Sequence, residues 1–186
     1  LVQVPDFWRT NFDNGIKLIG TNSDEVPTVN IQISIKGGQK MDYYDPSKAG
    51  LASLTASLMN ESTENYTSEE IQEELRLIAS SINVFSGSGE TSVNIRTLKK
   101  NLDRTLELAE EILFRPAFTE EDFNRVKQQQ IESIRASYQS PASIANQVYD
   151  RLLYGDEHIY SVPGSGIEET VERITVDDVK AFYNNY

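Results

Sequence analysis

The segment "GLASLTASLMNEST", Gly50 to Thr63, decides how this chain is interpreted. Apolar side chains recur in it at helical spacing, so it predicts a helix with one apolar face. That face consists of Leu51, Leu54, Leu58 and Met59. The opposite face presents Ser53, Ala56 and Ser57, at the i, i+3, i+4 spacing with which helices often display reacting groups. All three residues are small and neutral, so the helix has the spacing of a functional helix but no acidic, basic or imidazole side chain at these positions.

Strand patterns lie on both sides of this helix. The segment "FWRTNFDNGIKLIGTNS" (7–23) predicts two strands around an Asn-Gly turn, and "VPTVNIQISIKGG" (26–38) predicts a half-buried strand from its alternating apolar residues. Residues 81–98, "SINVFSGSGETSVNIRTL", predict a hairpin. The aromatic residues Phe7, Trp8 and Phe12 are expected in the core.

Further helices are predicted over residues 65–80, 99–116, 119–139, 140–155 and 175–186. Their expected N-caps are Thr67 or Ser68 for the first, Thr119 for the third and Thr175 for the last. Strands and helices come in separate runs, which predicts an α+β fold with an antiparallel-dominated sheet and helices packed on one face. We expect residues 1–186 to form a single domain.

The composition excludes several classes of protein. The chain has 186 residues and a net charge of −12, which argues against nucleic acid as a partner because phosphate binding needs clustered Lys and Arg. It has no cysteine, which excludes disulfides and cysteine-ligated metals. No apolar run approaches the roughly 18 residues of a membrane span. The chain begins at Leu1 and ends within a predicted helix, so we expect a piece of a longer protein.

Residues for catalysis are few. His158 is the only histidine, and its Gly/Pro-flanked surroundings favour a solvated or locally hydrogen-bonded side chain. There is no G-x-S-x-G elbow, and the glycine-rich segments match neither the P-loop nor the dinucleotide pattern. Paired carboxylates such as Glu69/Glu70 lie near helix ends or on polar faces, as solvated surface residues do.

Taken together, these segments resemble the pitrilysin/insulinase family of zinc peptidases, which includes the mitochondrial processing peptidase. The resemblance covers nearly the whole chain: the Asn-Gly turn and strand, the helix at 50–63, the hairpin and helix of "SSINVFSGSGETSVNIRTLKKNLDRTLELAEEILFRPAF", and the segment "LLYGDEHIYSVPGSGIEETVERITVDDVKAFYNNY". It implies a processing-peptidase-like metallohydrolase fold. Only the helix is specific by its chemistry; the other segments are specific by their order and length.

In active members of that family the helix carries H-x-x-E-H, whose two His bind zinc while the Glu acts as general base. By resemblance, the first His falls at Ser53, the Glu at Ala56 and the second His at Ser57. A third ligand, a Glu from a later helix, falls at about Ser133, with Glu132 adjacent. Every matched position therefore departs from the catalytic pattern. No zinc is expected in this chain, and no catalytic residue is assigned to it.

The resemblance also implies a role. Family members work as two similar halves, fused or separate, which close around a peptide, and often only one half carries zinc. The leading hypothesis is a non-catalytic half that completes the peptide-enclosing chamber with a zinc-bearing half, this chain being the first subdomain of that half. The alternatives are an active zinc-dependent endopeptidase, against which the residues speak, and a purely structural assembly subunit. Family analogy favours the bacterial periplasm or cell envelope.

Overall fold

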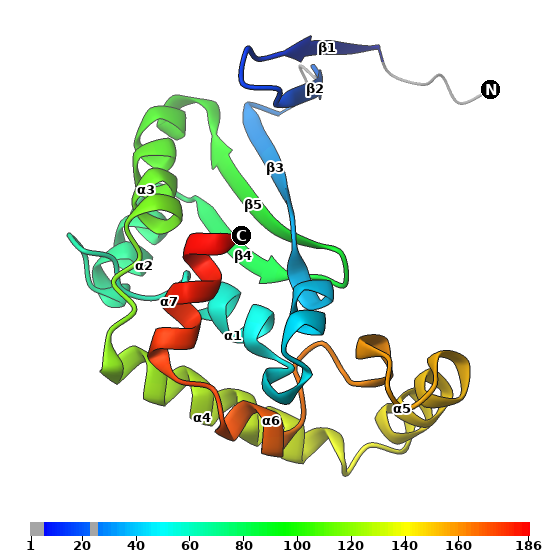
Figure 1. Ribbon diagram of the computed structural model, residues 1–186. Coiled ribbons are helices and arrows are strands. Elements are labelled where there is room, and N and C mark those ends of the chain that lie inside the picture. The colour runs from blue at the N-terminus through cyan, green and yellow to red at the C-terminus, as the bar shows by residue number, and fades with distance from the viewer. Residues whose placement is uncertain (1–5, 23–25) are drawn as a thin grey trace.

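The computed structural model describes residues 6–22 and 26–186, and it has strands and helices in the predicted order (Figure 1). Three strands form an antiparallel sheet in the order β3 (Thr28–Lys36), β5 (Glu90–Leu98), β4 (Ser81–Ser86). A separate hairpin joins β1 (Phe7–Asn11) to β2 (Lys17–Thr21); Ser23, the end of the predicted segment, lies outside the described residues. The predicted α+β class is confirmed.

The strand register places apolar residues on one face of the three-stranded sheet. Ile82 and Ile95 lie opposite each other, as do Val84 and Val93, and all four are at most 5% exposed. The intervening positions are polar: Gln32, Asn94 and Asn83 form a row across the other face. One face is therefore covered and the other is open, as period-2 alternation predicts for an antiparallel sheet.

Helices cover the apolar face of the sheet. The α-helices are α1 (Leu51–Leu58), α2 (Ser68–Leu77), α3 (Leu102–Phe114), α4 (Glu120–Ser137), α5 (Pro141–Tyr154), α6 (Glu168–Glu172) and α7 (Val176–Asn185). Within the described residues the chain also forms the 3₁₀ helices η1 (Gly38–Tyr44), η2 (Pro46–Lys48), η3 (Lys99–Asn101) and η4 (Ile159–Ser161). In the chain as described, no helix has the length and apolar character needed to cross a membrane.

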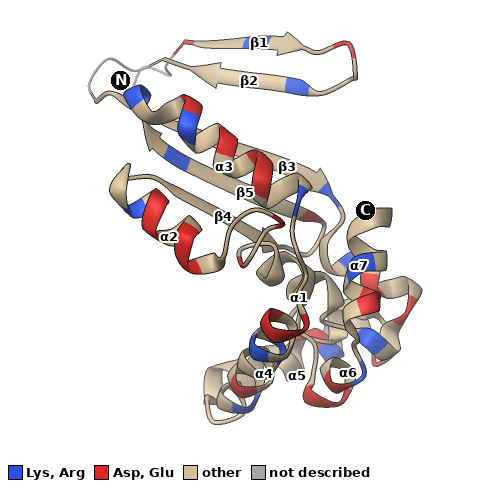
Figure 2. Ribbon diagram, turned by 90° about the vertical axis from the view of Figure 1, so that its left-hand side faces the viewer, with Lys and Arg blue, Asp and Glu red and all other residues tan. Residues whose placement is uncertain are grey.

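Helix α1 lies at the centre of this arrangement, in contact with β4, α4, α7 and η1 (Figure 1). Leu54 and Leu58 are at most 1% exposed and belong to the main hydrophobic cluster. Acidic residues are spread over the other helices, whereas α1 carries no charged residue (Figure 2). Burial on most sides, rather than helix propensity, therefore holds this short helix in place.

The predicted N-caps Thr67, Thr119 and Thr175 are confirmed. Each hydroxyl accepts a hydrogen bond from the backbone N–H three residues later, at distances of 3.2, 3.1 and 3.3 Å respectively. Helix α6, a short helix of five residues, was not predicted as a separate element.

The prediction that Phe7, Trp8 and Phe12 are core residues is wrong. They are 55%, 44% and 53% exposed, because they belong to the β1–β2 hairpin, which stands apart from the main sheet (Figures 1 and 2). The Trp8 ring lies over its cross-strand partner Gly20, where a Cβ atom would be only 2.2 Å from the ring. The aromatic surface is thus covered only locally, within the hairpin.

A buried carboxylate outside the helix satisfies the N-terminus of α1. Asp42, 3% exposed, accepts hydrogen bonds from the Gly50 N–H at 2.9 Å and the Ala52 N–H at 3.2 Å. These donors have no partner within the helix, so Asp42 supplies the cap that Gly50 lacks. Burial raises the pKa of Asp42 from 3.8 to about 6, although both hydrogen bonds act in the opposite direction.

We predict that Asp42 makes the chain less stable as the pH rises from about 4 to about 6. The folded chain holds a proton on Asp42 more readily than the unfolded chain does. Its contribution to the free energy of unfolding is therefore complete below pH 3.8 and is lost as the pH rises through about 6. A pKa change of this size corresponds to roughly 3 kcal/mol.

Urea denaturation of the wild type and of Asp42→Asn across this pH range checks the effect. The neutral variant should lack this component of the pH dependence, whereas Asp45→Asn, at a more exposed carboxylate, should keep it. Parallel pH profiles for the wild type and Asp42→Asn would contradict the assignment.

Candidate functional site

Ser53, Ala56 and Ser57, which the sequence resemblance assigns to the zinc motif, all lie on α1. Ser53 and Ser57 are half-buried, one turn apart, and Ala56 between them is 3% exposed. At the positions where a zinc helix carries imidazole and carboxylate side chains, α1 has only two hydroxyls and a methyl group. Hydroxyls are poor ligands for zinc, which proteins bind through His, Cys and carboxylate side chains.

The N-terminus of α1 meets α4 and the loop before α6. The Gln130 side-chain amide on α4 donates to the Gly50 carbonyl at 3.2 Å and to the Ser165 carbonyl at 2.8 Å. Gly50 has φ of +98°, and a Cβ atom there would lie 2.5 Å from the Ser165 oxygen, so only glycine fits this approach. The three segments are therefore fixed against one another at the start of the candidate helix.

Glu132 and Ser133 lie beyond this contact and are both exposed. Glu132 accepts a hydrogen bond from Gln128, one turn earlier on the outer side of α4, at 2.9 Å. Ser133 follows Gln130 by three residues and so lies nearer the side of α4 that faces α1. No hydrogen bond within residues 6–22 and 26–186 joins either residue to Ser53 or Ser57, and the convergence of Ser133 with them stays a prediction.

His158 has a local structural role. Its Nδ1 atom accepts a hydrogen bond from the Tyr160 backbone N–H at 3.1 Å, and its ring stacks on Tyr154 with centroids 5.4 Å apart. It thus caps η4, which agrees with the interpretation of a local hydrogen-bonding residue. In the part of the chain that is described, no group of three or more His, Cys, Asp or Glu residues could hold a metal ion.

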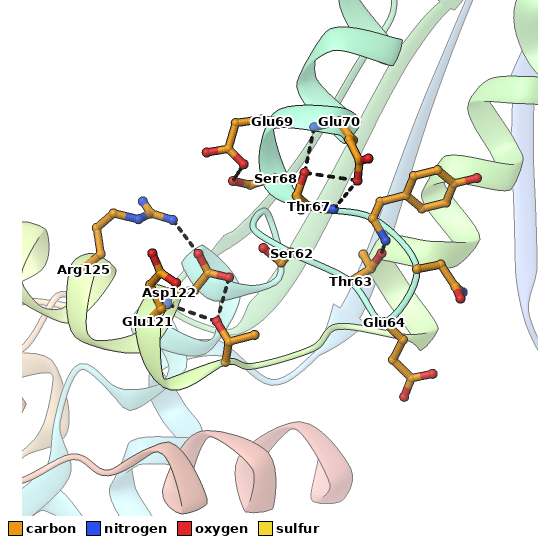
Figure 3. A pocket seen from close by; sticks show the side chains of 13 residues that line it. Ser62, Thr63, Glu64, Thr67, Ser68, Glu69, Glu70, Glu121, Asp122 and Arg125 are labelled. Carbon is orange, nitrogen blue, oxygen red and sulfur yellow. Dashed lines mark hydrogen bonds and ion pairs between the residues drawn. The ribbon is translucent and has the colours of Figure 1, made fainter.

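A hollow lies between the N-terminal ends of α2 and α4 (Figure 3). It encloses about 480 Å³, and its walls include Thr67, Glu69, Thr119, Asp122 and Arg125. Arg125 donates to Asp122 at 2.7 Å. Burial alone would raise the pKa of Asp122, but hydrogen bonds from Arg125, Ser62 and Thr119 outweigh it and lower the pKa below 3.8.

The Arg125 and Asp122 side chains of this hollow are therefore bonded within the protein. Arg125 also donates to Glu61 at 2.6 Å, so that one guanidinium joins the segment after α1 to the first turn of α4. Asp122 is held ionised by these partners and has no raised pKa with which to act as a general base. Asp122 and Arg125 therefore support the fold around α1.

Comparison with known proteins gives the fold a wider context. The family described as "Insulinase (Peptidase family M16)" matches residues 18–156. An uncharacterized zinc protease of Rickettsia bellii is 24% identical over 177 residues, which make up 95% of this chain and 42% of that protein. The non-peptidase homolog YmxG of Helicobacter pylori is 24% identical over 150 residues, 81% of this chain and 34% of that protein.

Solved structures have the same fold. The peptidase M16 inactive domain from Pseudomonas fluorescens matches with a TM-score of 0.87 at 20% identity, over 96% of this chain and 43% of that one. The periplasmic protease PqqL from Escherichia coli matches with a TM-score of 0.84 at 17% identity, over all of this chain and 21% of that one. The chain spans less than half the length of each of these four proteins.

We predict that His residues at positions 53 and 57, with a Glu at position 133, form a three-ligand zinc site. The variant Ser53→His/Ser57→His should bind zinc weakly through two ligands on one helix face. Adding Ser133→Glu should tighten binding by at least about tenfold, because it supplies the third protein ligand. Ala56 is left unchanged, since a charged side chain there would be buried.

Calorimetric zinc titration of the two variants measures the gain. Asn124→Glu, at an exposed position more than two turns earlier on α4, adds the same charge elsewhere and should leave the affinity of the two-His variant unchanged. Equal affinities with and without Ser133→Glu would mean that the three positions do not converge.

Proposed function

Because the chain belongs to the insulinase family of peptidases, peptidase family M16, we propose that it forms part of a non-catalytic half of a zinc-peptidase assembly. This half completes a peptide-enclosing chamber together with a zinc-bearing half. The observation that carries the proposal is the occupation of the motif positions on α1 by Ser53, Ala56 and Ser57. The likeness to an M16 inactive domain supports it.

The chemistry of these residues does not suit a zinc peptidase. A catalytic zinc is held by three protein ligands, His or carboxylate in most enzymes, and keeps one position for water. Ser53 and Ser57 offer hydroxyls that stay protonated at neutral pH, and Ala56 offers no base. The donor set therefore does not fit a zinc ion, and we derive no catalytic step for this chain. Zinc would belong to the partner half.

Helix α5 supports a role in assembly because its polar face lies toward the protein and its apolar face lies toward solvent. Its half-buried positions are Ser143, Gln147 and Asp150, which share one face at helical spacing. The large apolar residues face outward: Ile144, Val148, Tyr149, Leu152 and Leu153 are between 45% and 82% exposed. An apolar helix face in solvent is typical of a surface that another protein covers. We propose that the zinc-bearing half covers it.

We also propose that residues 1–186 form one domain, the first subdomain of the non-catalytic half. A single main hydrophobic cluster that draws on α1, α2, α3, α4, α7 and the sheet supports this assignment. A periplasmic or cell-envelope location is proposed on the likeness to a periplasmic protease.

We predict that the chain hydrolyses no peptide by itself and raises the activity of its zinc-bearing partner. The partner is the polypeptide with an intact H-x-x-E-H helix that the same or an adjacent gene encodes, and the probe is a mixture of unstructured peptides. Mixing the two should raise kcat/KM over the partner alone by at least about tenfold, or about 1.4 kcal/mol of transition-state stabilisation. Mass spectrometry of the cleaved peptides gives the rates.

Two α5 variants serve as a matched pair. Leu152→Glu places a charge on the exposed apolar face and should abolish the increase, while Gln147→Glu places one on the polar side and should preserve it. Zinc-dependent hydrolysis by the chain alone would overturn the non-catalytic assignment. A partner that reaches full activity without the chain would overturn the chamber role.

A further inference from the structure

Strand β4 lies at one edge of the three-stranded sheet. On its outer side no strand within the described residues pairs with it. A strand edge of this kind normally presents unpaired N–H and C=O groups, onto which an extended peptide can add as a further strand. Whether the chain can bind a peptide by backbone pairing at this edge therefore depends on whether the outward-facing N–H and C=O groups of β4 already have hydrogen-bond partners.

The side chain of Asn60 occupies the middle of that edge. Its Nδ2 group donates to the Val84 carbonyl at 2.8 Å, and its Oδ1 atom accepts from the Val84 N–H at 2.8 Å. One primary amide thus makes both hydrogen bonds that the backbone of an added strand would make. Because residues of a strand alternate in direction, the backbone groups of Ile82 and Ser86 point to the same side as those of Val84.

Asn60 is held in this position from the helix side as well. Its Nδ2 group also donates to the Ala56 carbonyl at 2.9 Å, while its backbone N–H donates to the Ser57 carbonyl at 3.1 Å. The Ala56 carbonyl would otherwise be one of the orphan acceptors at the end of α1. The half-buried Asn60 amide therefore satisfies the helix terminus and the strand edge together.

We propose that Asn60 closes the edge of β4 against extended peptides. A peptide that added to this edge would have to displace two good hydrogen bonds to Val84 and leave the Ala56 carbonyl unpaired. The peptide would replace the two Asn60 hydrogen bonds to Val84 with two of its own, so the number of hydrogen bonds at Val84 would not increase. This inference goes beyond the proposed function: whatever surface of the chain faces substrate, β4 does not take it up as an added strand.

The test measures peptide addition at β4 directly. The probe is an acetylated and amidated copy of residues 90–98, "ETSVNIRTL", the strand that pairs with β4 on its other side. Amide exchange and chemical shifts of Ile82, Val84 and Ser86 are followed by NMR in the chain with and without peptide. The wild type should show a protected Val84 amide and no shift changes at millimolar peptide.

Asn60→Ala should raise the exchange rate of the Val84 amide by at least about tenfold, because the bond that protects it is lost. Added peptide should then restore its protection and shift all three residues. Asn60→Ser is a second variant, since a serine hydroxyl can still reach the Ala56 carbonyl but cannot bridge to Val84. It should also bind the peptide, even if Asn60→Ala fails to fold.

Asn101→Ala is the matched control. Asn101 is another half-buried residue, and its side chain donates to the Ile78 carbonyl at 2.7 Å without contact to the outer edge of β4. This variant should bind no peptide at β4. Binding of the peptide at Val84 in the wild type would overturn the proposal, and so would folded Asn60 variants that bind none.

Discussion

Helix α1 has eight residues, too few to be stable in water by itself, and the rest of the structure is arranged to hold it. Three kinds of contact do this. Asp42 accepts hydrogen bonds from the free N–H groups at the start of α1. Asn60 bonds both a carbonyl at the end of α1 and strand β4. Leu54 and Leu58 fill the core between the sheet and the helices. None of these contacts uses Ser53, Ala56 or Ser57 side chains as hydrogen-bonding groups.

This separation means that the contacts holding α1 do not depend on a metal at Ser53, Ala56 and Ser57. In a small zinc domain the metal supplies folding free energy, so loss of its ligands unfolds the chain. Here α1 is fixed by buried apolar side chains and by carboxylate and amide groups outside the motif positions. Replacement of a motif residue by serine or alanine then removes chemistry and leaves the packing in place. The same scaffold can serve in an assembly whose zinc lies elsewhere.

The features that could be predicted from the sequence are those set by residues close together along the chain, such as helix caps and strand alternation. The caps Thr67, Thr119 and Thr175 act three residues away, and the alternation in β4 and β5 reports directly which face is buried. Asp42, Asn60 and Gln130 were not singled out, because the groups they bond, on Gly50, Val84 and Gly50 respectively, lie 8, 24 and 80 residues away along the chain. Trp8 was assigned to the core since aromatic residues usually signal burial, but its partner is Gly20 within an exposed hairpin.

We infer that the motif positions of α1 do not bind zinc. The most direct test is the zinc content of the wild-type chain, purified without chelators and measured by atomic emission after gel filtration. We expect far less than one zinc ion per chain, with no change on Ser53→Ala. Close to one zinc ion per chain, lost on Ser53→Ala or Glu132→Gln, would contradict it.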